Sequence, residues 1–223
     1  MNELYIFGAG EFAKIASSYF SDEGVYDIKG FVVDDEHFND SCKSINAFPI
    51  FKFSEVFERF KSSEVRVFVA ISASRMNLDR ANVYERLKKL GCQFASYVSP
   101  KAFVSSKATL GENVFVFEEN VIQNDVEIGD NTILWSGNHV GHQSKIGSHV
   151  FLSSHVVISG FCTIERYCYF GVNSTLVDHL FISQGTLVGA GSLILKDTEQ
   201  NSVYVGNPAK KIDGKDPFKV NFR

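Results

Sequence analysis

An aliphatic residue recurs at every sixth position from Val104 to Ile194. An α-helix needs apolar recurrence near 3.6 residues and a half-buried strand needs a period of 2, so a period of six fits neither. It is typical of a parallel β-helix, in which each hexapeptide forms one short strand and a turn, and equivalent positions stack from coil to coil. The series, in which only Phe170 departs from Val, Leu or Ile, is Val104, Leu110, Val116, Ile122, Ile128, Leu134, Val140, Ile146, Leu152, Ile158, Ile164, Phe170, Leu176, Ile182, Val188 and Ile194.

The repeat predicts a three-sided solenoid. Four residues after each aliphatic position comes a mostly small side chain, as at Ala108, Ser144 and Ser174, which suits an inward-facing site at a tight turn. Three hexapeptides make one coil, so sixteen of them form roughly five coils.

The first 99 residues show a different pattern, in which short apolar runs alternate with helical spacing. This alternation predicts a small parallel α/β sheet, with Ser99-Pro100 at the join to the β-helix. We therefore expect a Rossmann-like domain over residues 1–99 and a β-helix domain with a C-terminal tail over 100–223. The expected strands are 4–7, 28–33, 65–71 and 94–98, and the expected helices are 11–20, 54–61 and 79–90.

Composition excludes several classes of function. The chain has 223 residues, 22% of them charged, and a net charge of −4, which argues against a nucleic-acid surface. Its four cysteines lack CxxC spacing, so we expect reduced structural thiols rather than disulfides, and no metal. The chain shows neither a signal peptide nor an apolar run long enough to span a membrane, so we expect a cytoplasmic protein.

The first candidate site is the turn that contains Gly8 and Gly10, between a strand and a helix. Glycines there allow close approach of a ligand, and the helix N-terminus favours a phosphate. Asp34 and Asp35 after the second strand, and Ser72 after the third, end at the same sheet edge and suit sugar or base hydroxyls. The alternative is a purely structural turn.

The second candidate is His142, two positions past the buried Val140 and near a turn, so that its ring should point out of the coil. A neutral imidazole beside a substrate amine can accept a proton. His139 is a possible second polar group in the same cleft. The alternative is a surface turn residue, which is the role expected of the turn histidines His149, His155 and His179.

The third candidate is the glycine-rich end of the coil, Gly189-Ala190-Gly191, with the exit segment that ends at Lys210. A flat ledge there suits a long thin ligand, with Lys210 near its phosphates. The alternative is a plain cap, which every solenoid needs.

With these motifs the chain resembles the sugar O- and N-acyltransferases of the left-handed β-helix superfamily. It is most similar to the bacterial nucleotide amino-sugar N-acetyltransferases and the sialic acid O-acetyltransferases. The resemblance covers nearly the whole chain: the glycine-rich N-terminal unit, Asp34-Asp35, the hexapeptides, and the ending Val205-Gly206-Asn207-Pro208-Ala209-Lys210.

The resemblance implies that His142 is the general base. The family usually places an acidic residue directly after this histidine, whereas Gln143 stands here. A second family histidine, which contacts the thioester carbonyl, falls at Phe151. The N-terminal motif also departs, with Gly10-Glu11-Phe12 in place of Gly-Gly-His.

The resemblance further implies a homotrimer, with acetyl-CoA in the groove between adjacent β-helices. Phe151, Gly160, Val172, Ala190 and Lys210 would then contact the acyl donor. Gly8, Gly10, Asp34, Asp35 and Ser72 would hold the nucleotide sugar.

These expectations combine into one function: acetyl transfer from acetyl-CoA to the amine of a nucleotide-linked amino-deoxysugar in surface glycan biosynthesis. One alternative is O-acetylation of a sugar such as sialic acid, and another is a non-catalytic trimer that binds nucleotide sugars. An NAD-dependent oxidoreductase is a weaker alternative, because that function would not account for the β-helix.

Overall fold

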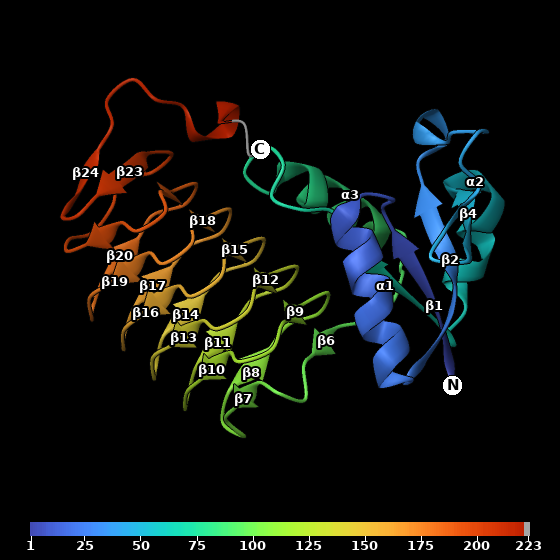
Figure 1. Ribbon diagram of the computed structural model, residues 1–223, viewed down its shortest axis with the longest axis horizontal. Helices are drawn as coiled ribbons and strands as arrows, with labels where there is room; N and C mark the ends of the chain where they lie inside the picture. The colour runs from blue at the N-terminus through green and yellow to red at the C-terminus, as the bar shows by residue number, and fades with distance from the viewer. Residues whose placement is uncertain (221–223) are drawn as a thin grey trace. The chain divides into compact units, whose positions relative to one another are not determined.

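The computed structural model describes residues 1–220 and divides into two compact units (Figure 1). The N-terminal unit comprises Met1–Ser72 and Asn82–Ser96. The second unit contains the β-helix from Tyr97 onward and, in addition, the segment Ala73–Ala81. The expected division at residue 99 therefore lies close to the observed one, but it leaves out this inserted segment.

The N-terminal unit is a five-stranded sheet of order β3-β4-β2-β1-β5, in which only β3 is antiparallel to its neighbour. Buried apolar side chains such as Leu4, Ile6 and Val67 form its core. The hairpin β3–β4 was not predicted from the sequence. The elements are β1 (Asn2–Phe7), α1 (Glu11–Glu23), β2 (Tyr26–Val33), η1 (Asp35–His37), β3 (Ser44–Ile45), β4 (Phe48–Lys52), α2 (Phe53–Val56), η2 (Phe57–Lys61), β5 (Val65–Val69) and, from Asn82 onward, α3 (Leu78–Lys89).

The strand predicted over 94–98 is wrong, because its two ends belong to different units. Phe94 makes only an isolated bridge to Val67 in the N-terminal unit. Tyr97 and Val98 instead form β6, which pairs with β9 as the first strand of the β-helix.

The predicted β-helix is present, and each of the sixteen aliphatic positions is the second residue of a two-residue strand. Strands pair in parallel with those one coil away, so that Ile122, Val140 and Ile158 lie in one row. The strands are β6 (Tyr97–Val98), β7 (Phe103–Val104), β8 (Thr109–Leu110), β9 (Phe115–Val116), β10 (Val121–Ile122), β11 (Glu127–Ile128), β12 (Ile133–Leu134), β13 (His139–Val140), β14 (Lys145–Ile146), β15 (Phe151–Leu152), β16 (Val157–Ile158), β17 (Thr163–Ile164), β18 (Tyr169–Phe170), β19 (Thr175–Leu176), β20 (Phe181–Ile182), β21 (Leu187–Val188), β22 (Leu193–Ile194), β23 (Val203–Gly206) and β24 (Ala209–Lys211), followed by η3 (Pro217–Lys219).

Three sheets form the sides of the β-helix, and we name them by one strand each. The β13 sheet has the order β22-β19-β16-β13-β10-β7, the β14 sheet β20-β17-β14-β11-β8, and the β15 sheet β24-β23-β21-β18-β15-β12-β9-β6. The first corner joins the β13 and β14 sheets, the second joins the β14 and β15 sheets, and the third joins the β15 and β13 sheets.

From Asn113 to Gly191, each corner turns through a residue with positive φ, three positions after the buried aliphatic one. Asparagine, aspartate and glycine tolerate this conformation best, and a bulky residue there is unusual. Phe161 and Tyr167 are such residues, with φ of 58° and 61°.

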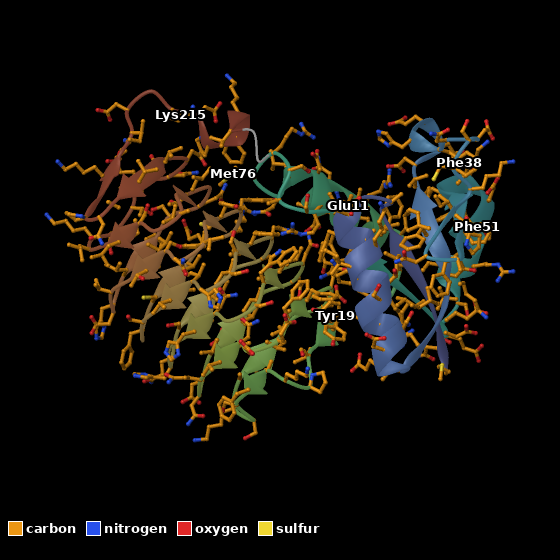
Figure 2. All side chains as sticks on the ribbon, viewed as in Figure 1. Glu11, Tyr19, Phe38, Phe51, Met76 and Lys215 are labelled. Carbon is orange, nitrogen blue, oxygen red and sulfur yellow. The ribbon has the colours of Figure 1, made fainter. Side chains whose placement is uncertain are left out.

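The segment Ala73–Ala81, in which Figure 2 labels Met76, is fixed to the β15 sheet by buried side chains. Met76 packs with Leu187 and Val203 of that sheet. The Asn77 amide donates to the carbonyl of Cys168 at 3.2 Å. The guanidinium of Arg80 donates through Nε to Asn131 and through Nη2 to Val150, both to carbonyl oxygens at 3.2 Å.

Arg80 is fully buried, with its guanidinium 6.0 Å from the centre of the Phe151 ring. Burial lowers the pKa of Arg80 to about 9, so the side chain still carries its charge at neutral pH. Arg80 thus attaches the inserted segment to main-chain carbonyls of the coil.

We predict that Arg80→Ala lowers the free energy of unfolding by about 3 kcal/mol, because the buried Asn131 carbonyl loses its Arg80 donor and the Val150 carbonyl keeps only the N–H of Ile133. Urea unfolding followed by circular dichroism measures the change. Arg75→Ala, which removes an exposed arginine of the same segment, is the control and should alter stability by less than about 0.5 kcal/mol. Equal effects of the two changes would contradict the anchoring role of Arg80.

Candidate functional site

His142 lies at the first corner, between β13 and β14, and its side chain is exposed, as predicted. Its main-chain N–H donates to Oε1 of Gln123 at 2.9 Å. The rings of His142 and Phe161 form a T-shaped pair, with ring centres 4.9 Å apart at an angle of 88°. His142 therefore contacts the preceding coil through its main chain and the following coil through its ring.

Gly160 lies under the His142 ring, in the equivalent position one coil further on. A Cβ atom at residue 160 would lie 2.9 Å from Cε1 and 3.0 Å from Nε2 of His142, so a larger residue would displace the ring. Within residues 1–220, the N–H of Gly160 donates no hydrogen bond. The site thus places an imidazole next to a main-chain donor that is free to bind a ligand.

A shallow pocket of about 390 Å³ opens beside His142 and is lined by Phe103, Gln123, Asn124 and His142. Asn124 holds the position equivalent to His142 one coil earlier, as the bond from the Gln143 N–H to the Asn124 carbonyl at 3.0 Å shows. Phe103, Gln123 and Asn124 were not predicted from the sequence as site residues. The signal that could have found Asn124 is its spacing of one full coil from His142.

In the described part of the chain, no carboxylate makes a hydrogen bond or ion pair with His142. Gln143 is exposed and turns the corner with φ of 57°. Phe161 in turn stacks on His179, with ring centres 4.6 Å apart, and Nε2 of His179 lies 3.8 Å from Asp178. The ring neighbour of His142 is therefore aromatic, and Gln143 occupies the position where the family it resembles usually has an acidic residue.

The expectation that His149 is a surface residue is wrong, because its side chain is only 4% exposed. Nδ1 of His149 pairs with the amide of Asn131 at 2.8 Å, and the ring stacks on Tyr167 at 5.0 Å. His155 and His179 are exposed, as expected.

The two glycines of the N-terminal turn differ in what they require. At Gly8, φ is 124° and a Cβ atom would lie 2.8 Å from the Ala70 carbonyl oxygen. The backbone conformation and this close contact therefore explain why position 8 is a glycine. Gly10 precedes α1 and has no atom within 4 Å of a Cβ position, and no side chain caps the helix. The open helix N-terminus at Gly10 therefore stays a candidate for an anion.

The acidic pair Asp34 and Asp35 already has partners within the N-terminal unit. Asp34 accepts from Nη2 of Arg86 at 2.7 Å, and Asp35 accepts from Oγ and the main-chain N–H of Ser54 at 2.6 and 3.1 Å. These hydrogen bonds from Ser54 lower the pKa of Asp35. Ser72 is exposed, three residues after the end of β5. The assignment of these side chains to a sugar nucleotide stays a prediction.

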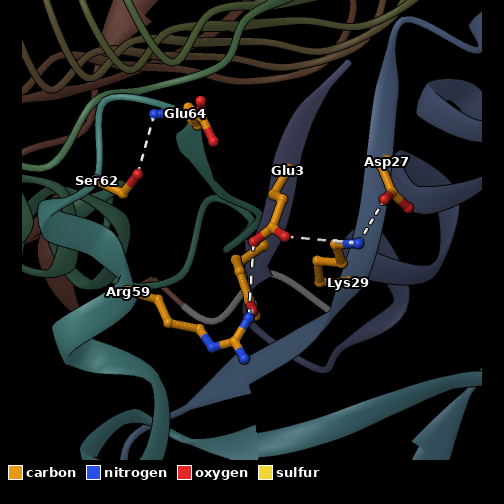
Figure 3. A network of polar contacts seen from close by, with 7 residues as sticks. Glu3, Asp27, Lys29, Arg59, Ser62 and Glu64 are labelled. Atoms are coloured by element: carbon orange, nitrogen blue, oxygen red, sulfur yellow. Dashed lines mark hydrogen bonds and ion pairs between the residues drawn. The ribbon is translucent and has the colours of Figure 1, made fainter.

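The N-terminal unit has another pocket, of about 400 Å³, lined in part by Tyr5, Lys29 and Arg59. Figure 3 shows that both cations are paired: Glu3 lies 3.6 Å from Lys29 and 3.8 Å from Arg59, and Asp27 lies 2.5 Å from Lys29. Glu3 is near the start of β1, whereas Gly8 follows its end, so this pocket lies away from the predicted nucleotide edge.

The residues predicted to contact the acyl donor occupy separate places on the β-helix. Val172 and Ala190 are exposed at the third corner, on the opposite side of the β13 sheet from Gly160. Phe151 is buried in the β15 sheet and stacks on Tyr169 at 5.5 Å. Lys210 is exposed on β24. Each of these roles stays a prediction.

Residues 1–220 contain neither a candidate metal site nor a helix that could span a membrane. Among them, no group of three or more His, Cys, Asp or Glu side chains is arranged to hold a metal ion. No helix in this range combines the length and apolar character needed to cross a bilayer.

The coil geometry and the preceding α/β unit define a hexapeptide-repeat protein of the left-handed β-helix class. Residues 3–87 match the PglD N-terminal domain family. The N-terminal unit is therefore similar to that family, in line with the resemblance found in the sequence.

Solved structures share this fold across both units. The acetyltransferase domain of PglB from Neisseria gonorrhoeae is 24% identical and superimposes with a TM-score of 0.83, over 95% of this chain and 100% of that one. PerB from Caulobacter crescentus, solved with CoA and GDP-perosamine, is 24% identical with a TM-score of 0.84, over 95% and 98% of the two chains. The predicted fold class is confirmed.

Sequence relatives match a shorter region. The UDP-3-O-acylglucosamine N-acyltransferase of Methylorubrum extorquens is 32% identical over 108 residues, which are 41% of this chain and 31% of that protein. The chain thus spans about a third of the length of that relative.

We predict that Asp35→Asn weakens the N-terminal unit in a pH-dependent way. Because the folded-state pKa of Asp35 lies below its ordinary value of 3.8, its stabilising effect is complete above that pH and is lost as the pH falls through the folded-state value. The urea midpoint of the variant should lie below that of the wild type at pH 7, and the difference should narrow below pH 3.8. The control is Asp40→Asn, which changes an exposed carboxylate nearby. If the difference in urea midpoint between the wild type and Asp35→Asn does not depend on pH, the prediction is contradicted.

Proposed function

We propose that the protein transfers an acetyl group from acetyl-CoA to the amine of a nucleotide-linked amino-deoxysugar, in surface glycan biosynthesis. The observation that carries this proposal is the exposed His142 ring against Gly160, whose N–H donates to no other residue within 1–220, beside a pocket. The relatives support it, because PerB is described with CoA and GDP-perosamine and the PglB domain as an acetyltransferase.

In the proposed reaction, the amine nitrogen attacks the thioester carbonyl carbon and the carbonyl π electrons move to oxygen. His142 takes the proton that the nitrogen loses, and the Gly160 N–H stabilises the oxyanion. Collapse of the intermediate breaks the C–S bond, and the leaving thiolate takes up a proton. The products are an amide and CoA, and the balance requires neither a metal nor an acyl-enzyme.

The same proposal includes a homotrimer. Gly160 and the pair Val172 and Ala190 lie at opposite edges of the β13 sheet, so a donor that touches both groups passes between two copies of the β-helix. The outer face of this sheet exposes Val121 and Val157, 36% and 37% accessible, which suits contact with a second copy. A cytoplasmic location fits the four free thiols.

The function is tested by thiol release from acetyl-CoA with a panel of UDP-, dTDP- and GDP-linked 3- and 4-amino sugars, with free sialic acid included. Turnover of one amino sugar supports the proposal and identifies the acceptor. Turnover of sialic acid alone would indicate O-acetylation instead. Nucleotide-sugar binding without turnover would support a non-catalytic binding protein.

We predict that His142→Ala lowers kcat at least about hundredfold, because the proton acceptor is removed. Steady-state kinetics at saturating acetyl-CoA measures the loss. His155→Ala is the control, since it removes another exposed corner imidazole at the third corner. A loss under about tenfold in His142→Ala would count against the general-base role.

We predict that Gln143→Glu moves the acidic limb of the kcat/KM profile to higher pH by about one unit. A carboxylate next to an imidazole stabilises the protonated ring, so the base would become active only at higher pH. Gln143→Ala supplies no charge and should leave the limb in place. Identical pH profiles for the two variants would show that residue 143 does not act on His142.

A further inference from the structure

His142 lies between two neighbours in one column of the first corner. Asn124 precedes it by one coil and Gly160 follows it by one coil, as the bonds from Gln143 N–H to Asn124 O and from Phe161 N–H to His142 O show, both at 3.0 Å. The oxyanion donor proposed above, the Gly160 N–H, is on the later coil. The earlier coil is therefore the side of His142 that is open to the acceptor.

Two side-chain amides line the pocket on this side, and their oxygen atoms are already in use. Oε1 of Gln123 accepts from the His142 main-chain N–H at 2.9 Å. Oδ1 of Asn124 accepts from Oγ of Ser105 at 2.5 Å. These bonds fix which end of each amide is the NH2 group.

Neither of these NH2 groups donates a hydrogen bond to another residue in the described range 1–220. Each amide nitrogen is a donor only, so the ligand atoms it suits are acceptors such as hydroxyl or carbonyl oxygens. Two donors beside the base give the pocket a means to orient a polyhydroxylated ligand.

The pocket lining carries no Lys, Arg, Asp or Glu. A sugar carboxylate is bound most strongly by arginine or lysine, and this lining offers neither. Phe103, 60% exposed, adds a flat apolar surface that suits the C–H face of a deoxysugar ring. The chemistry of the pocket therefore matches an uncharged sugar.

We infer that Gln123 and Asn124 form the acceptor-sugar subsite and select an uncharged hexose ring by donating to its hydroxyl oxygens. This inference rests on the proposed acetyl transfer and adds the class of acceptor to it. The ring lies on the Asn124 side of His142, with its amine toward the imidazole and the thioester on the Gly160 side.

Gln123→Glu and Asn124→Asp test the inference, because each change keeps the accepting oxygen and the side-chain size but replaces the NH2 donor. We expect each change to raise KM for the preferred nucleotide amino sugar about tenfold. The KM for acetyl-CoA should change less than about twofold, since the thioester lies on the other side of His142. Because a new carboxylate close to His142 shifts the pH optimum, each variant is assayed at its own optimum.

The matched control is Gln184→Glu, an amide-to-carboxylate change at the second corner. Oε1 of Gln184 accepts from Nε of Arg166 at 2.8 Å, and glutamate preserves that bond. This variant should leave both KM values at the wild-type level.

Acceptors that lack one ring hydroxyl complete the experiment. If Asn124 or Gln123 donates to that hydroxyl, the deoxygenated acceptor has a raised KM with wild type and no further increase with the corresponding variant. If removal of a hydroxyl and substitution of the side chain raise KM by independent factors that multiply, for every hydroxyl tested, the inference is overturned.

The outcomes separate the inference from the proposed function. Wild-type turnover of neutral amino sugars with raised KM in both variants supports the inference. Wild-type turnover with unchanged variants overturns the subsite and leaves the acetyl transfer standing. Turnover of sialic acid alone overturns the neutral-sugar specificity, and no turnover of any acceptor overturns the proposed function and the inference with it.

Discussion

Hydrogen bonds between successive coils are the interaction on which the β-helix unit depends. Strands of two residues have almost no stability alone, and they persist because each pairs in parallel with the strands one coil before and after it. This pairing brings residues one coil apart into columns. The candidate site is one such column, in which Asn124, His142 and Gly160 lie in sequence along the first corner.

The period of six predicted the β-helix because its core is simple: every coil buries aliphatic side chains at equivalent positions. The inserted segment Ala73–Ala81 could not be predicted in the same way. Its anchors, Asn77 and Arg80, are polar residues that normally stay exposed, and they are buried here because carbonyls of the coil accept their hydrogen bonds. Hydrophobic pattern carries no information about such pairs. The strand expected over 94–98 failed for a related reason, since an apolar run does not show which sheet its residues join.

The candidate site was predictable in part. The outward direction of His142 followed from its distance to Val140, while its role rested on the resemblance. Gln123 was missed because its contribution is a side-chain bond to a main-chain N–H, which spacing does not reveal. In the N-terminal unit, the partner of Asp34 is Arg86, 52 residues away, and only the fold brings them together.

The one-coil spacing also restricts how a chain of this kind can change in length. Loss of a single residue between Val104 and Ile194 would shift every later aliphatic side chain out of its inward position, and the damage would extend to the end of the solenoid. Removal or duplication of a complete coil leaves all the inward positions aligned. A longer corner loop also preserves this alignment, because the chain leaves the coil and returns to it at the same two points. Descendants of such a gene should therefore differ by whole coils or by corner insertions, and the first corner around His142 should keep its length.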